Sequence, residues 1–273
     1  MAEENAITVT YKPRVAIIKI NRPKKLGALN GDLYYQLGEK MREVAARDDI
    51  YVTVLAGTGR FFSAGADVNR IQEDPNADRR RAAARGIVSN NLDLTHTFYT
   101  HPKIIVVALN GPAVGLSAAL TAFGDFIYSA PHSYILTPFS SLGLVAEGGA
   151  SRALVSRLGL PKANEALLMS RKILIDDLVS TGYVNKVFTP PSGKQDDSEG
   201  FLKLVLEEIE DKLGPHLNQD SLVKIKSLIR APETEILEKQ NVKEVFLGMG
   251  RFADGIPQEE FRKLASGEKK HKL

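Results

Sequence analysis

Hydrophobic residues in the first half of the chain follow two alternating spacings. Short β-rich apolar runs predict five strands, the first two joined as a hairpin around Lys12-Pro13, at residues 8–11, 15–20, 52–56, 104–109 and 126–129. Between them, apolar positions at helical spacing predict a helix beginning near Asn30 or Asp32 and a second from about Asp78 to Tyr99. Strands that alternate with helices in this way are typical of an α/β fold.

The second predicted helix has an apolar stripe with one polar member. Asn91 falls in line with Ile87, Leu94 and Phe98. The run Arg79-Arg80-Arg81 at the start of the helix is typical of a solvated face, with a phosphate contact as the alternative.

The character of the chain changes in the polar, proline-bearing segment 189–197. Beyond it, apolar residues spaced by four from Phe201 to Leu213 predict a helix, and further apolar runs predict helices over 222–229 and 236–252. We therefore expect residues 1–195 to form the core with the functional site and residues 196–273 to form a helical C-terminal region. A charged helical tail of this kind commonly packs on a neighbouring subunit.

Composition narrows the possible chemistry. The 273 residues include no cysteine, which excludes disulfides, thiolate nucleophiles and cysteine-based metal sites. The 36 Lys and Arg against 33 Asp and Glu leave a net charge of only +3, which argues against a dedicated nucleic-acid or membrane-surface protein. No apolar run approaches the roughly 20 residues of a membrane span.

Several catalytic and cofactor-binding motifs are matched only in part. Gly57-Thr58-Gly59 begins like a dinucleotide-binding loop, but Phe62 stands where its third glycine belongs. Ser117 lacks the glycine two places later that an esterase nucleophile needs, because Ala119 is there. The five histidines show no metal-ligand spacing. We therefore expect no bound metal and no dinucleotide cofactor.

Three glycine-bearing segments, each expected near the end of a strand, remain as candidates: 60–67, 110–119 and 141–149. In the first two, a glycine precedes Ala66 or Leu116, whose backbone N–H groups are candidate donors to an oxyanion. Leu116 would also begin a helix, whose dipole favours negative charge.

The third segment has one carboxylate, Glu147, between apolar residues and Gly148-Gly149. Burial there would raise its pKa toward the range of a general base. The alternative is that the glycines are turns and helix caps and that Glu147 is a structural carboxylate at a helix start.

Taken together, these segments resemble a known family. Four stretches, 21–29, 62–67, 110–115 and 126–130, are similar to the signature of the crotonase (enoyl-CoA hydratase/isomerase) superfamily, with Gly27 in place of a usual asparagine. The similarity extends from about Ile7 to Leu264.

The resemblance implies a spiral of ββα turns, a C-terminal helical region used to form a homotrimer or dimer of trimers, and acyl-CoA thioester substrates. It implies that the Ala66 and Leu116 N–H groups polarise the thioester carbonyl. The reaction that the resemblance implies needs no separate cofactor, since CoA is part of the substrate. Substrate would contact Ala64, Gly65, Ala66, Asp67, Val68, Leu116, Lys24 and Leu26, with the CoA phosphates near the basic turn that contains Arg22, Lys24 and Lys25.

The reaction depends on side chains around that oxyanion hole. Ala119 and Phe139 occupy the places where hydratases of this family have glutamates, and Ala146-Glu147-Gly148-Gly149 resembles the peroxisomal Δ3,Δ2-enoyl-CoA isomerases. We therefore expect Glu147 to shift the double bond of 3-enoyl-CoA to trans-2-enoyl-CoA, a step in β-oxidation of unsaturated fatty acids.

Competing hypotheses remain open. A dienoyl-CoA isomerase would need a second acidic group, and residues 126–146 contain no Asp or Glu. Hydration of an enoyl-CoA, thioester hydrolysis, RNA binding and a role as a non-catalytic acyl-CoA-binding scaffold are further hypotheses. The final His271-Lys272-Leu273 resembles the Ser-Lys-Leu address read by the peroxisomal import receptor, and predicts a peroxisomal location.

Overall fold

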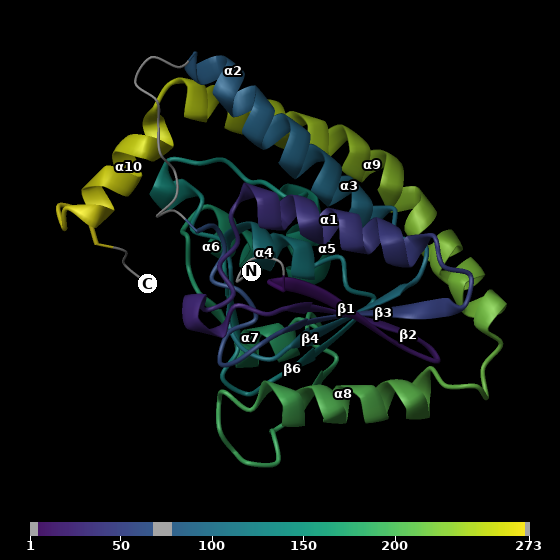
Figure 1. Cartoon of the computed structure of the whole chain (residues 1–273). Helices are drawn as coiled ribbons and strands as arrows, with labels where there is room; N and C mark the ends of the chain where they lie inside the picture. The colour runs from purple at the N-terminus through teal and green to yellow at the C-terminus, as the bar shows by residue number, and fades with distance from the viewer. Residues whose placement is uncertain (1–4, 68–77, 271–273) are drawn as a thin grey trace.

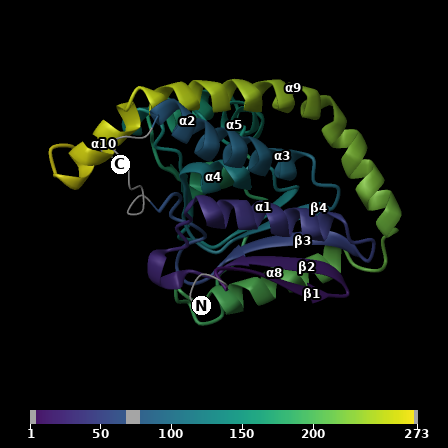
Figure 2. The same cartoon turned by 45° about the horizontal axis from the view of Figure 1, so that its top comes forward.

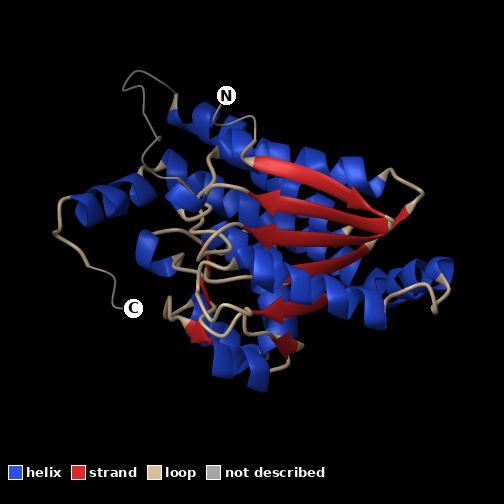
Figure 3. Cartoon of the chain, turned by 60° about the horizontal axis from the view of Figure 1, so that its bottom comes forward, coloured by secondary structure: helices blue, strands red, loops and turns tan. Residues whose placement is uncertain are grey.

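The computed structural model describes residues 5–67 and 78–270. All five predicted strands are present and lie in one six-stranded sheet of order β1-β2-β3-β4-β6-β9 (Figure 3). The hairpin of the first two is antiparallel and every other pair is parallel. The strand bounds are β1 (Ile7–Lys12), β2 (Arg14–Ile20), β3 (Ile50–Gly57), β4 (Ile104–Leu109), β6 (Phe126–Ser129) and β9 (Lys186–Val187).

A second, three-stranded sheet, β5-β7-β8, lies beside the first. Its strands are β5 (Ala113–Val114), β7 (Tyr134–Leu136) and β8 (Ile173–Leu174), and the helices and short turns around the two sheets are η1 (Pro23–Lys25), α1 (Gly31–Ala45), α4 (Gly115–Thr121), η4 (Ser140–Leu142), α5 (Ala150–Leu158), α6 (Leu160–Leu167) and α7 (Ile175–Ser180). Asn30 caps α1 through its side chain, which accepts from the Leu33 N–H, so the predicted helix start is confirmed.

The core has a layer on each face of the main sheet. Every residue of β4 is buried, as expected of a central parallel strand covered on both sides. Helices α1, α4 and α5 cover one face, and α8 (Ser198–Lys212) covers the other (Figures 1 and 2). Phe201, Val205 and Ile209 of α8 pack against β2, β3 and β4, which confirms the predicted spacing of four.

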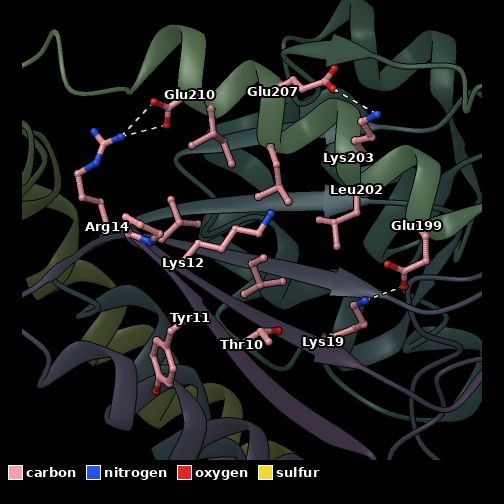
Figure 4. A pocket seen from close by; sticks show the side chains of 15 residues that line it. Thr10, Tyr11, Lys12, Arg14, Lys19, Glu199, Leu202, Lys203, Glu207 and Glu210 are labelled. Atoms are coloured by element: carbon pink, nitrogen blue, oxygen red, sulfur yellow. Dashed lines mark hydrogen bonds and ion pairs between the residues drawn. The ribbon is translucent and has the colours of Figure 1, made fainter.

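The edge of the α8 layer contains an open groove of about 790 Å³ between α8 and the β1–β2 hairpin (Figure 4). Charged side chains pair across it, Arg14 with Glu210 at 3.0 Å and Lys19 with Glu199 at 2.6 Å. The groove shares no lining residue with the three candidate segments.

The helix predicted from Asp78 to Tyr99 is continuous but changes its winding. It begins as α2 (Arg79–Ala83), widens into the π-helical segment η3 (Ala84–Leu92) and continues as α3 (Asp93–Tyr99). Such segments are frequent at functional sites. Asn91 lies in η3.

The two helices predicted over 222–229 and 236–252 are wrong as separate elements. They form one 35-residue helix, α9 (Gln219–Ala253), with Pro232 inside it. Packing of α9 against α2, η3, α3 and α5 compensates for the hydrogen bond that proline cannot make (Figure 2). A final helix, α10 (Ile256–Ala265), follows Gly255. Within the described ranges, no helix is both long and apolar enough to cross a membrane.

Residue 195, where we divide the chain, falls in the segment between β9 and α8. Helix α8 shares a hydrophobic cluster with the sheet and α9 contributes Leu237 to the other cluster, so these two helices pack directly on the core.

Candidate active site

Ala66 has a backbone N–H that is directed away from its neighbouring strand residue. Gly65 C=O accepts from the Leu29 N–H at 2.8 Å, and the Asp67 N–H donates to Leu29 C=O at 2.9 Å. This parallel bridge uses the groups on either side of Ala66. Among the described residues, the Ala66 N–H has no acceptor.

Leu116 offers the second donor. It lies in the first turn of α4, where backbone N–H groups have no partner within the helix. Gly65 brings the two loops together, because a Cβ at this position would lie 2.8 Å from the Val114 carbonyl oxygen. Gly65 also has a φ of +84°, which favours glycine.

Two adjoining cavities bring the predicted residues together. One, of about 690 Å³, is lined by Ala64, Gly65, Ala66, Leu116 and Glu147, and by the α10 face. The other, of about 260 Å³, also contains Ala66, Leu116 and Glu147, and extends past Tyr34 and Asp67 to η3. The residues of both amide donors and the carboxylate therefore border the same two cavities.

Glu147 lies at the junction of the two cavities. Burial and, to a smaller extent, the negative charge of Glu244 raise the pKa of Glu147 to about 7, against the opposing effect of a hydrogen bond from Asn91. Asn91 donates from Nδ2 to Oε2 of Glu147 at 2.9 Å. A carboxyl group with this pKa can accept and return a proton near neutral pH.

The glycines after Glu147 fix where its side chain begins. A Cβ on Gly148 would lie 2.7 Å from Cδ1 of Leu116 and 3.0 Å from Cβ of Ala119. Gly148 and Gly149 both have a φ of +70°. The turn therefore packs tightly on α4, the helix that supplies the second amide donor.

The two positions that lack hydratase glutamates are filled with apolar side chains. Ala119 is fully buried under Gly148, and Phe139 is buried beside the larger cavity. Neither side chain can transfer a proton.

Other predicted contacts do not reach the cavities. Lys24 and Leu26 are not among the lining residues, although Leu26 C=O accepts from the Ala64 N–H at 2.8 Å. Arg22, which we expected near the CoA phosphates, instead pairs with buried Asp67 at 3.3 Å. Val68 lies outside the described residues.

Three contributions to the site were missed by sequence reasoning. Asn91 was visible only as a polar member of an apolar stripe, Glu244 gave no local signal, and α10 contributes Phe261 and Arg262 to the cavity wall. All three come from segments distant in sequence from Glu147.

Comparisons with known proteins agree with this geometry. The sequence profile of the enoyl-CoA hydratase/isomerase family matches residues 10–200. The chain therefore belongs to that family, the crotonase superfamily. It is 25% identical to a crystal structure of enoyl-CoA hydratase/isomerase from Pseudoalteromonas atlantica, with a TM-score of 0.82 over 98% of this chain and 100% of that one. The predicted crotonase-type fold with its C-terminal helical region is confirmed.

Several curated relatives are named as isomerases. A Delta(3,5)-Delta(2,4)-dienoyl-CoA isomerase of Pyricularia oryzae is 59% identical over 97% of this chain and 98% of its own. A 3,2-trans-enoyl-CoA isomerase of Saccharomyces cerevisiae is 34% identical, covering 94% and 93%. Enoyl-CoA delta isomerase 3, peroxisomal, of Mus musculus is 28% identical, covering 96% and 77%.

Proposed function

We propose that this protein is an enoyl-CoA isomerase that moves a carbon–carbon double bond along the acyl chain of a CoA thioester. The observation that carries the proposal is the placement of Glu147, with a pKa raised to about 7, in the same space as the Ala66 and Leu116 N–H groups. The relatives named as isomerases support it.

For a 3-enoyl-CoA, one base is enough. Glu147 takes a proton from Cα, and the electrons of that C–H bond form an enolate conjugated with the existing double bond. The N–H groups of Ala66 and Leu116 stabilise the negative oxygen of this dienolate. Glu147 then returns the same proton at Cγ, which leaves the double bond between Cα and Cβ. No cofactor or oxidant is required.

The test is turnover of a 3-enoyl-CoA to the conjugated trans-2-enoyl-CoA, followed by ultraviolet absorbance. Glu147→Gln keeps the shape and the acceptor for Asn91 but cannot take a proton, so the rate should fall at least ~100-fold with acyl-CoA affinity kept. Glu233→Gln, a matched change on the surface of α9, should retain the rate. Equal rates in Glu147→Gln and wild type would contradict the single-base mechanism.

A second candidate substrate is a 3,5-dienoyl-CoA, which the 59% identical Pyricularia relative favours. Conversion to the 2,4-dienoyl product returns the proton two carbons farther along the chain. Asp67 is the other carboxylate among the described cavity residues, and it is paired with Arg22. Comparing kcat/KM for 3-enoyl-CoA and 3,5-dienoyl-CoA under identical conditions distinguishes the two substrates.

Assembly as a homotrimer or dimer of trimers is part of the proposal. Large apolar side chains on α9 are exposed in the single chain, including Leu228, Ile229, Phe246 and Leu247. Burial of such a surface drives association. Sedimentation analysis tests this expectation, and a monomer at micromolar concentration would contradict it.

A peroxisomal location is proposed from the mouse relative named peroxisomal. The residues expected to bind the import receptor, His271, Lys272 and Leu273, lie outside the described residues. Fluorescence localisation of the chain with and without them is the test, and equal distributions would contradict the signal.

A further inference from the structure

Glu244 is a second buried carboxylate, and the proposed reaction does not use it. It lies on α9 and is only 4% exposed. One of its oxygens accepts from the Gly149 N–H at 2.7 Å; the other accepts from the Ser151 N–H at 2.9 Å and from the Ser151 hydroxyl. Among the described residues, no cation is paired with it.

These contacts favour the ionised form of Glu244. Burial raises the pKa of Glu244, but the three donors from Gly149 and Ser151 oppose that rise. The carboxylate also lies at the amino end of α5, where the helix dipole favours an anion. The three donors fix the carboxyl group in position, while burial keeps the pKa of Glu244 above its ordinary value.

We propose that Glu244 is a positioning residue for Glu147: it holds the Gly148-Gly149 turn through the Gly149 N–H and places a fixed negative charge near the base. The inference rests on the proposed function, in which Glu147 is the base. Because Gly149 is two residues after Glu147, the bond from Glu244 restrains the backbone from which the base projects.

The charge has a chemical consequence for a one-base reaction. Glu147 must keep the proton it takes from Cα until it returns it at Cγ, so its acid form must be accessible. Glu244 favours that acid form by repulsion, and Asn91 favours the carboxylate by donating to Oε2. Glu244 on α9 and Asn91 on η3 therefore have opposite effects on the pKa of Glu147.

Other titratable or charged groups border the same cavities, and each has a partner of its own. Tyr34 of α1 shares a hydrogen bond with Ser117 at 3.1 Å, and burial raises its pKa, so it stays neutral. Asp67 is paired with Arg22. Arg262 of α10 is paired with Glu259 and Glu268.

The test compares Glu244→Gln with Glu233→Gln. Glu233 is also on α9 and also binds α5, through Arg152 at 2.6 Å, but it is partly exposed and does not contact the Glu147 turn. The readout is the pH dependence of kcat/KM for 3-enoyl-CoA. We expect the acidic limb of Glu244→Gln to move to lower pH by about half a unit or more, because a like charge is removed. The limb of Glu233→Gln should coincide with wild type.

A role in packing alone would lower the rate without moving the limb, so coincident limbs in Glu244→Gln and wild type would overturn the proposal. Infrared difference titration of the Glu147 carboxyl gives the same comparison without turnover. If the wild type does not turn over enoyl-CoA, the proposed function fails, and the infrared midpoints still decide the role of Glu244.

A further measurement does not depend on the folding of Glu244→Gln. In Glu147→Gln, the neighbouring charge is absent, so Glu244 should be a carboxylate at pH 7, where the wild-type base titrates. An infrared band of a protonated buried carboxyl that persists through pH 7 in Glu147→Gln would overturn the proposal, because Glu244 would then carry no charge.

Discussion

Replacing Glu147, the proposed base, should make the protein more stable at alkaline pH. The pKa of Glu147 rises from 4.5 to about 7 because burial and the charge of Glu244 disfavour its carboxylate. A carboxyl whose pKa is higher in the folded state than in the unfolded state destabilises the fold when it ionises. This penalty is absent below about pH 4.5, grows between pH 4.5 and 7, and is complete above pH 7. Glu147→Gln removes it.

The size of the effect follows from the pKa difference. A change from 4.5 to about 7 corresponds to an upper limit of about 3 kcal/mol, at 1.36 kcal/mol per unit. The side chain borders a cavity that admits water, which screens part of the repulsion, so we expect about 1–2 kcal/mol. The glutamine side chain can still accept from Asn91, so no hydrogen bond is lost with the charge.

The measurement is urea unfolding of Glu147→Gln and wild type at pH 8.5 and at pH 4.5, at fixed protein concentration because the chain is expected to associate. The variant should have the larger free energy of unfolding at pH 8.5, and the difference should shrink toward zero at pH 4.5. A variant that is equally stable or less stable at pH 8.5 would refute the assignment of Glu147 as a destabilised, buried base.

Two other substitutions and one substrate comparison test the site. Gly65→Ala should lower turnover by ~10²–10³-fold in a folded protein, because its Cβ pushes the two oxyanion donors apart; circular dichroism and steady-state kinetics check this. Gly148→Ala should lower the free energy of unfolding by ~1–3 kcal/mol, since its φ is positive and its Cβ contacts Leu116, and urea unfolding would show no change if that turn were loose. Hydration of trans-2-enoyl-CoA should be slight beside isomerisation, because Ala119 and Phe139 cannot activate water, and comparable rates with the two substrates would contradict this.

The sequence predicted the central strands β2, β3 and β4 well because they are buried on both faces. Continuous apolar runs such as 104–109 are stable only inside the core, and the structure bounds that strand by the same residues. We predicted two helices in place of α9 because Pro232 interrupts the helical spacing of apolar residues. Its continuity depends on packing against helices far away in the chain, which local spacing cannot report.

The parts of the site that could be predicted are those marked by a neighbouring glycine in the sequence. Gly65 and Gly148 mark close approaches, and the residues beside them, Ala66 and Glu147, are the ones that border the cavity. Asn91 and Glu244 were not predictable, because each acts on the 147–151 segment from a distant part of the chain. Glu244 is 95 residues from the Gly149 N–H that it binds.

The preference between the two substrates depends on which carbon of the acyl chain receives the returned proton. An enoyl and a dienoyl thioester present the same carbonyl to Ala66 and Leu116 and the same Cα proton to Glu147, so the oxyanion hole cannot distinguish them. They differ in whether a dienolate is protonated at Cγ or a trienolate is protonated two carbons beyond. In the described cavity, Glu147 is free to move a proton, whereas Asp67 is held by Arg22. One mobile proton donor favours the shorter shift, and a dienoyl substrate would require the acyl chain to bring its distant carbon back to the same carboxyl group.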